Sequence, residues 1–303
     1  MITRTDVEAA AARIAGRVRR TPVLASDHWL KLEFLQHSGS FKARGAFHRI
    51  LRALEAGDVP AAGVVAASGG NHGAAVAYAA RTLGLPAEIW VPTTTPPVKV
   101  DRLRRLGAAV VQHGSEYAVA YEAASKRAID TGALFCHAYD HPDVCAGQGT
   151  VGLELLDQAP GLDTVLLAVG GGGLMAGVAA ALEGRARVVA VEPATAPTLH
   201  AALAAGGPVD VDVSGVAADS LGARRLGTIA YQVAARTSVT SLLVTDDQIV
   251  EARQLLWDRY RVAVEHGTAA AYAALEHAAY RPSPNEQVAV LLCGANTTLT
   301  TLT

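Results

Sequence analysis

The sequence has few cysteines, few aromatic residues and almost no net charge. Its three cysteines, Cys136, Cys145 and Cys293, are too few for a disulfide framework, which indicates a reducing, cytoplasmic setting. A net charge of −2, with both signs spread along the 303 residues, gives no electrostatic basis for binding nucleic acid or an anionic membrane surface. No apolar run approaches the ~20 residues that a membrane-spanning helix needs, and residues 1–20 lack the apolar core of a secretory signal.

Hydrophobic residues make up half of the chain, which is long enough for about two domains or one large α/β unit. Short apolar strands alternate with alanine-rich helices, and this alternation predicts parallel, doubly wound sheets. The expected helices lie at 5–19, 42–55, 71–84, 96–106, 115–131, 146–157, 173–183, 195–205, 247–260 and 267–279. The expected strands lie at 29–35, 63–67, 87–91, 108–112, 133–136, 163–169, 186–192, 239–244 and 287–293.

Two glycine-bearing turns follow expected strands, at the edge where open α/β sheets bind ligands. The turn ASGGNHG, 67–73, offers Ser68 and Asn71 as helix caps, and its glycines let an anion approach free N–H groups. A plain capped turn is the alternative. The turn AVGGGGLMAG, 168–177, has four consecutive glycines where a plain turn needs one or two. A phosphate held by successive N–H groups explains this excess.

Two further stretches carry reactive side chains. In LLCGANTT, 291–298, Cys293 is either a small buried residue or a neutral hydrogen-bonding partner for a ligand. In SGSFKARGA, 38–46, Lys42 stands at an expected turn from strand to helix. Most lysines are solvated charges, but a lysine beside a phosphate site can form an imine with a carbonyl cofactor. A Rossmann nucleotide site is an alternative for the four-glycine turn, because Glu192 ends the next strand about 20 residues on.

Six motifs occur in one order: KLEFLQHSGSFKARGA, VVAASGGNHGAAVAYAA, CAGQGTVGLELL, VGGGGLMAGVAAAL, VAVEP and LLCGAN. Together they resemble the pyridoxal-phosphate-dependent serine/threonine dehydratases. That group has the tryptophan synthase β-like fold, fold type II, which also includes serine racemase. The resemblance extends from about residue 5 to 300 and displaces the nucleotide alternative. It implies two doubly wound α/β domains with pyridoxal 5'-phosphate in the cleft between them. The large domain would be 1–47 plus 143–303 and the small domain 48–142, in a homodimer.

The resemblance also implies a role for each matching residue. Lys42 would bind the cofactor as a Schiff base and remove the substrate Cα proton, while Phe41 would pack on the pyridine ring. Cys293 would face the pyridine nitrogen, where most relatives have serine, and Asn71 would bind the ring's phenolic oxygen. The remaining implied contacts are Gly170, Gly171, Gly172, Gly173 and Leu174 to the phosphate, Ser68, Gly69, Asn71 and His72 to the substrate carboxylate, and Gly222 and Glu265 beside the cofactor.

The implied reaction converts a β-hydroxy L-amino acid, such as L-threonine or L-serine, to a 2-oxo acid and ammonia. A neutral thiol at the ring nitrogen makes the ring a moderate electron sink, which favours prompt loss of the β-hydroxyl. Three alternatives share the fold. Racemases carry a serine base where this chain has Gly69, and β-replacement synthases usually show TSGN. A binding protein with weak turnover is suggested by Phe34, where many relatives have asparagine, and by a shortened link before Trp29.

No metal is expected, although two stretches of the sequence contain candidate metal ligands. Relatives that bind a cation carry an acid a few positions before the match to Asp219, and residues 213–218 contain none. The segment CHAYDHPDVC has a spacing that resembles a zinc site. Pro142 interrupts a helix there, and the matching family segment is a loop without metal. The four candidate ligands of that segment are Cys136, His137, His141 and Cys145.

Overall fold

The structure, a computed structural model, describes residues 1–59, 61–298 and 302. Two mainly parallel sheets with helices on both faces make up the fold. This confirms the doubly wound α/β class that the alternation of strands and helices predicts. Within the described ranges, no helix is both long and apolar enough to cross a membrane.

The larger sheet is built from segments that lie far apart in the sequence. Its β1–β2 hairpin is antiparallel, and its other described strand pairs are parallel. Trp29 of β2 pairs with Ala289 of β10, so an early and a late segment of the chain lie side by side in this sheet. In spatial order its strands are β1 (Val23–Ala25), β2 (Trp29–Lys31), β10 (Val288–Leu291), β7 (Thr164–Ala168), β8 (Arg187–Pro193) and β9 (Thr240–Val244).

The smaller sheet comes from one continuous stretch of chain. Its four strands are all parallel, which requires a helix between consecutive strands. Their spatial order is β5 (Ala109–Gln112), β4 (Ala87–Val91), β3 (Val64–Ala67) and β6 (Leu134–Phe135).

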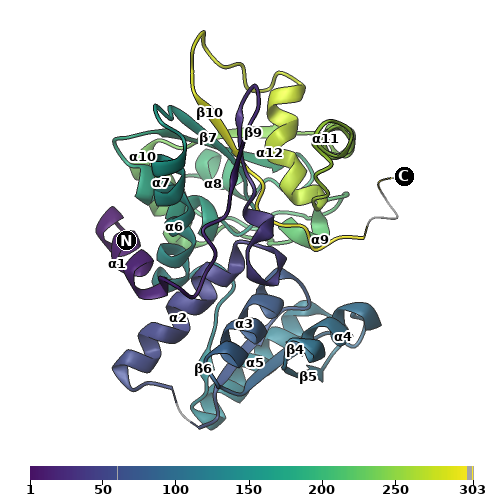
Figure 1. Cartoon of the computed structure of the whole chain (residues 1–303). Helices are drawn as coiled ribbons and strands as arrows, with labels where there is room; N and C mark the ends of the chain where they lie inside the picture. The colour runs from purple at the N-terminus through teal and green to yellow at the C-terminus, as the bar shows by residue number, and fades with distance from the viewer. Residues whose placement is uncertain (60, 299–301, 303) are drawn as a thin grey trace.

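Helices cover both faces of each sheet. On the smaller sheet, α5 packs on one face of β3, while α2, α3 and α4 pack on the other. Figure 1 shows this sheet below the larger one, with α2 passing between the two halves. The helices are α1 (Arg4–Ile14), α2 (Lys42–Ala56), α3 (Asn71–Thr82), α4 (Pro97–Arg105), α5 (Tyr117–Thr131), α6 (Pro142–Gln158), α7 (Gly173–Leu182), α8 (Thr198–Ala205), α9 (Ala218–Leu221), α10 (Thr228–Thr237), α11 (Asp246–Tyr260) and α12 (His266–Glu276), with 3-10 turns η1 (Glu33–Leu35) and η2 (His37–Gly39).

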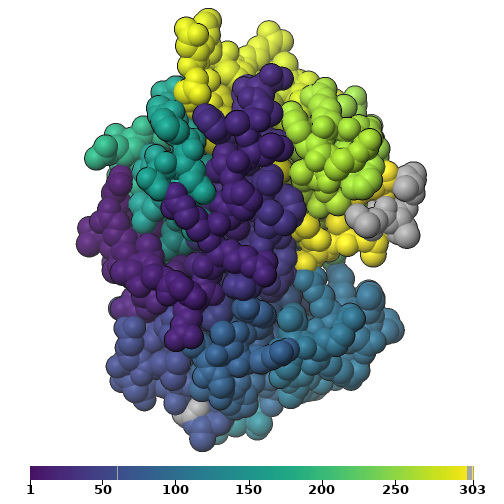
Figure 2. Space-filling model, viewed as in Figure 1, coloured from purple at the N-terminus to yellow at the C-terminus, as the bar shows by residue number. Residues whose placement is uncertain are grey.

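On the larger sheet, one core includes side chains of α1, α6, α7, α8 and α10, and the opposite core includes those of α11 and α12. Neighbouring residues of β7 point to opposite cores, as the alternation of a strand requires: Val165 and Leu167 to one, Leu166 and Ala168 to the other. Figure 2 shows the N-terminal segment, in purple, lying across one face of the molecule directly above the smaller sheet's half, in blue.

The structure differs from the sequence expectations in several elements. Strand β1 and helix α10 were not predicted, and the expected strand 29–35 is divided into β2 and the turn η1. Helix α6 begins at Pro142 rather than 146. Pro142 therefore opens a helix instead of interrupting one, because a proline in the first turn loses no helical hydrogen bond. The domain limits at 48 and 142 stay a prediction, and they fall in α2 and at the start of α6.

Helices α2, α6 and α7 pack so closely that their backbones touch at glycines. A Cβ added to Gly147 of α6 would lie 2.7 Å from Gly45 Cα and 2.8 Å from Arg44 O. On the other side of α6, a Cβ on Gly149 would collide with the Gly177 carbonyl of α7. These crossings fix the position of Lys42, the first residue of α2, relative to Gly173, the first residue of α7.

Candidate active site

Lys42 lies at the junction of the two halves. The segment before it is held by backbone contacts, because Phe41 N–H donates to Cys293 O at 3.0 Å and Ser40 bridges to Gly294. Lys42 is partly buried, and its amine donates to the Ala138 carbonyl oxygen at 2.8 Å. Burial lowers the pKa of this lysine to about 8, so a useful fraction of the amine is neutral near physiological pH.

The four-glycine turn forms an anion cradle at the start of α7. Its carbonyls are occupied, since Gly170 O accepts from the Thr198 hydroxyl, Gly171 O from Gly227 N–H and Gly172 O from Ala176 N–H. The N–H groups from Gly170 to Met175 have no protein partner among the described residues. Free N–H groups at a helix N-terminus are suited to a phosphate.

The protein also requires these glycines for its own packing. Gly172 has φ of +86°, a left-handed conformation that favours glycine. A Cβ on Gly171 would collide with the ring of Tyr139, and one on Gly173 would lie 2.8 Å from Tyr139 O. The excess of glycine that the sequence shows therefore has a second cause besides an anion.

Cys293 follows β10 in the sequence, and its side chain is a neutral thiol. Its Sγ is 3.3 Å from the Thr268 hydroxyl oxygen, and burial raises its pKa to about 12. The Thr268 hydroxyl also accepts from Gly294 N–H at 2.9 Å, which fixes the turn that follows the strand. A neutral thiol can share a hydrogen bond with a pyridine nitrogen but cannot act as its counter-ion.

Asn71, Glu265 and Asn296 form a partly buried polar triad. Asn71 Nδ2 donates to Glu265 Oε1 at 2.8 Å, Asn296 N–H donates to Glu265 Oε2 at 3.3 Å, and Asn296 Nδ2 donates to Asn71 Oδ1. Burial raises the pKa of Glu265 to about 7 although both hydrogen bonds favour the charged carboxylate. Asn296 was not predicted as a site residue, although it belongs to the motif LLCGANTT.

One cavity brings the predicted cofactor contacts together. The predicted residues that line it are Phe41, Lys42, Asn71, Gly170, Gly171, Gly172, Gly173, Leu174, Glu265 and Cys293. Gly222 is not among its lining residues, because it follows α9 and its neighbours Ser220 and Leu221 face the cavity instead. The lining residues that the sequence did not predict are Tyr139, Ala168, Met175, Ser220 and Leu221.

The loop before α3 corrects the capping prediction. Gly70 is the N-cap residue of α3 and supplies no side-chain cap, while Asn71 is already the first helical residue. Ser68 Oγ accepts from Gly70 N–H at 3.2 Å. The N–H groups of Gly69, Asn71 and His72 have no partner among the described residues. They therefore leave a helix N-terminus open to a carboxylate.

His72 and Gly69, two residues of this loop that were predicted to contact the substrate carboxylate, lie close to other protein groups. The imidazole of His72 is buried, with Nε2 2.8 Å from Cys136 O, and burial lowers its pKa to about 3. The neutral ring thus donates to a backbone carbonyl and holds the loop. A Cβ on Gly69 would lie 3.1 Å from Thr95 Cγ2, so the space for a side chain here is narrow.

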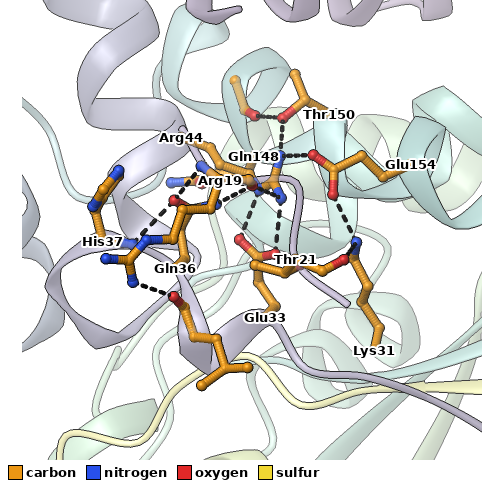
Figure 3. A network of polar contacts seen from close by, with 12 residues as sticks. Arg19, Thr21, Lys31, Glu33, Gln36, His37, Arg44, Gln148, Thr150 and Glu154 are labelled. Carbon is orange, nitrogen blue, oxygen red and sulfur yellow. Dashed lines mark hydrogen bonds and ion pairs between the residues drawn. The ribbon is translucent and has the colours of Figure 1, made fainter. Parts of the chain in front are cut away.

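A buried charge network anchors the helix that carries the lysine (Figure 3). Arg44 donates to both carboxylate oxygens of Glu33, at 2.6 and 2.8 Å, and to Glu154 at 2.7 Å. Lys31 Nζ donates to the other oxygen of Glu154 at 2.6 Å. The two cations and two anions balance, and they tie the start of α2 to the N-terminal segment and to α6.

The residues considered for metal or nucleotide binding have other partners. His137 Nδ1 accepts from the N–H groups of Tyr139 and Asp140, and Asp219 pairs with Lys99. No cluster of three or more His, Cys, Asp or Glu side chains suited to a metal occurs in the part of the chain that the structure describes. Glu192 accepts from the N–H groups at the start of α8, so it caps that helix.

The cavity fits pyridoxal phosphate. The N–H groups of Gly170 to Met175 suit its phosphate, the Lys42 amine suits its aldehyde, and the neutral thiol of Cys293 suits its ring nitrogen. Asn71 keeps one amide hydrogen free of the triad for the ring's phenolic oxygen. Phe41 has its ring centroid 5.1 Å from Lys42 Nζ, so it forms the adjoining wall.

Known proteins of this architecture match nearly the whole chain. The L-threonine ammonia-lyase of Geobacter sulfurreducens is 37% identical over 91% of this chain and 71% of that protein. The phenylserine dehydratase of Ralstonia pickettii is 38% identical over 94% of this chain and 90% of that protein. The structure of maize serine racemase superimposes with a TM-score of 0.92 at 32% identity, covering 99% of this chain and 95% of that one. The model of the pyridoxal-phosphate dependent enzyme family matches residues 14–294, and the chain belongs to that family.

Proposed function

We propose that this protein is a pyridoxal-phosphate-dependent ammonia-lyase that converts a β-hydroxy L-amino acid, such as L-threonine or L-serine, to a 2-oxo acid and ammonia. One observation carries the proposal. The Lys42 amine, with its lowered pKa, shares a cavity with the N–H cradle of Gly170 to Met175 and with the neutral thiol of Cys293. The names of the threonine ammonia-lyase and the phenylserine dehydratase support it.

Each residue has a defined task in this reaction. When bound, pyridoxal phosphate supplies an electron sink for the negative charge that develops at the substrate Cα. Lys42 Nζ takes the Cα proton, and its pKa of about 8 keeps enough neutral amine for this near neutral pH. The N–H groups of Gly69, Asn71 and His72 receive the substrate carboxylate, while Ser68 Oγ holds the loop through Gly70.

The neutral thiol of Cys293 favours elimination over a long-lived carbanion. A thiol with a pKa of about 12 does not stabilise a protonated ring nitrogen as a carboxylate would. The electron pair left by the Cα proton therefore forms the Cα–Cβ double bond as the Cβ–O bond breaks, and the departing hydroxide combines with the proton taken from Cα to give water. The enamine that is released, 2-aminoacrylate from L-serine or 2-aminocrotonate from L-threonine, tautomerises to an imine, which one water hydrolyses to the 2-oxo acid and ammonia.

A racemase is the second candidate, because serine racemases are among the similar proteins. Racemisation needs a second acid–base group on the face of the substrate opposite Lys42. Gly69, which stands where racemases of this group carry serine, has no side chain, and Thr95 crowds the position. This observation favours the lyase.

The test is a product assay with the purified holoenzyme on L-threonine, L-serine and other β-hydroxy amino acids. We expect 2-oxo acid and ammonia in equal amounts, with little D-amino acid on a chiral column. Absence of 2-oxo acid from every substrate in the panel would refute the lyase. D-Amino acid as the main product would establish the racemase instead.

A further inference from the structure

Four aromatic side chains form a continuous series that begins beside the lysine. His137 and Tyr139 flank Ala138, whose carbonyl oxygen accepts from Lys42. Their ring centroids are 5.0 Å apart, and the next ring, Tyr121, lies 6.0 Å from His137. Tyr117 follows at 6.0 Å from Tyr121. We call this series, Tyr117, Tyr121, His137 and Tyr139, the aromatic wall.

The aromatic wall extends from the cavity to the surface. Tyr139 lines the cavity together with Lys42, whereas Tyr117 at the other end is 52% exposed. Partial burial of its hydroxyl and, after that, the nearby phenols of Tyr139 and Tyr121 raise the pKa of Tyr117 to about 12. The wall is anchored from behind by Phe135, whose ring meets Tyr121 edge-on at 5.5 Å.

The wall presents neutral groups. Burial lowers the pKa of His137, and its Nδ1 accepts two backbone N–H groups, so the ring stays uncharged at neutral pH. The carboxylate of Asp140, which acts on His137, accepts from the N–H groups of Thr228 and Ile229 at the start of α10. An aromatic ring would find partners here at normal stacking distances.

We propose that the aromatic wall receives the substituent on the substrate Cβ and selects β-aryl-β-hydroxy amino acids over L-threonine and L-serine. The inference rests on the proposed function, because it places the substrate Cα beside Lys42. A phenyl ring buries far more apolar area against these rings than the methyl group of threonine does. The free energy from this contact therefore raises the selectivity for an aryl group.

Binding is tested separately from elimination by titrating the holoenzyme with L-phenylalanine and L-alanine and following the cofactor's visible absorbance. Neither amino acid has a β-hydroxyl to lose. We expect L-phenylalanine to bind at least about tenfold more tightly than L-alanine. Tyr117→Ala and Tyr121→Leu should each reduce that ratio roughly three- to tenfold, and Tyr117→Phe should retain it. Tyr117 is exposed, so its variants keep the test valid if Tyr121→Leu does not fold.

Turnover then separates the two proposals. We expect the ratio of kcat/KM for L-threo-3-phenylserine to that for L-threonine to exceed one and to fall in the same variants. Two results would overturn the proposed role of the aromatic wall even if threonine is deaminated. One is equal affinity for L-phenylalanine and L-alanine, and the other is an affinity ratio that stays unchanged in both Tyr117→Ala and Tyr121→Leu. Preference for L-phenylalanine without 2-oxo acid from any substrate would support the wall and refute the lyase.

Discussion

Lys42 Nζ lies 2.8 Å from the carbonyl oxygen of Ala138, and this contact joins the two halves of the molecule at the reactive amine. Lys42 opens helix α2, which starts against the larger sheet, while Ala138 follows the last strand of the smaller sheet. Burial lowers the lysine pKa to about 8. The carbonyl fixes the position of the amine, and the lowered pKa keeps a useful fraction of it neutral near pH 7.

Replacing Lys42 should remove both cofactor attachment and activity. We expect borohydride reduction of the holoenzyme to fix the cofactor on the peptide that contains Lys42, and Lys42→Ala to lose this label. Activity of Lys42→Ala should fall by at least about 10³-fold, because the proton acceptor at Cα is gone. Lys126→Ala is the control, since that lysine is exposed, pairs with Asp130 and does not line the cavity. Label on another lysine would contradict the assignment.

The lowered pKa of Lys42 should set the pH dependence of cofactor uptake. Only the neutral amine attacks an aldehyde, and its fraction rises about tenfold per pH unit below the pKa. With a pKa of about 8, the rate at which the apoprotein takes up pyridoxal phosphate should rise from pH 6 to 8 and level off above pH 9. Stopped-flow absorbance measures this rate. A rate that still rises tenfold between pH 9 and 10 would indicate an ordinary, solvated lysine.

The charge network around Arg44 should be important for stability. Arg44→Met leaves Glu33 buried without its cation, and breaking a buried pair in this way costs about 3–5 kcal/mol. Urea unfolding of the apoprotein measures the change in the free energy of unfolding. Arg20→Ala is the matched control: its partner Asp157 is 72% exposed, so we expect less than about 0.5 kcal/mol. Equal changes in the free energy of unfolding would show that the buried network stabilises the protein no more than the exposed Arg20–Asp157 pair does.

The crossing of α2 and α6 should tolerate no side chain at Gly147. An alanine Cβ would lie 2.7 Å from Gly45 Cα and 2.8 Å from Arg44 O, which forces the helices apart. We expect Gly147→Ala to destabilise the protein by about 1–3 kcal/mol despite the better helix propensity of alanine. Weaker cofactor binding should accompany it, because Lys42 moves with α2. Gly207→Ala, which meets no atom within 4 Å, should leave both quantities unchanged.

Local sequence patterns predicted most strands, the four-glycine turn and the position of Lys42, because each is encoded by neighbouring residues. The pattern missed α10, whose buried face consists of Ala230, Val233 and Ala234, two of them too small to mark an apolar stripe. Tyr139 and Asn296 were missed for another reason. Each reaches the site only through contacts with distant residues, Tyr139 with Gly171 and Asn296 with Glu265. The partners of Arg44 likewise come from separate segments.

The capping prediction failed because a side chain's type does not fix its position in the turn. Ser68 and Asn71 both favour helix caps, but Gly70 takes that position, since its lack of a Cβ permits φ of −108° with ψ of −144°. As a result, the N–H groups of Gly69, Asn71 and His72 have no partner in the part of the chain that the structure describes.

The pairing of β2 with β10 determines the order in which the molecule can be completed during synthesis. The smaller sheet, from β3 to β6, is a continuous stretch, so it can fold as soon as it leaves the ribosome. The larger sheet can be completed only after residues 289–293 have been synthesised, because Trp29 pairs with Ala289 and Phe41 binds the backbone of Cys293. Lys42 is translated early, yet its surroundings exist only after Cys293 has emerged. The surroundings of Lys42 are therefore completed late in folding, so under the proposed function we expect the cofactor to attach only to a chain that has folded.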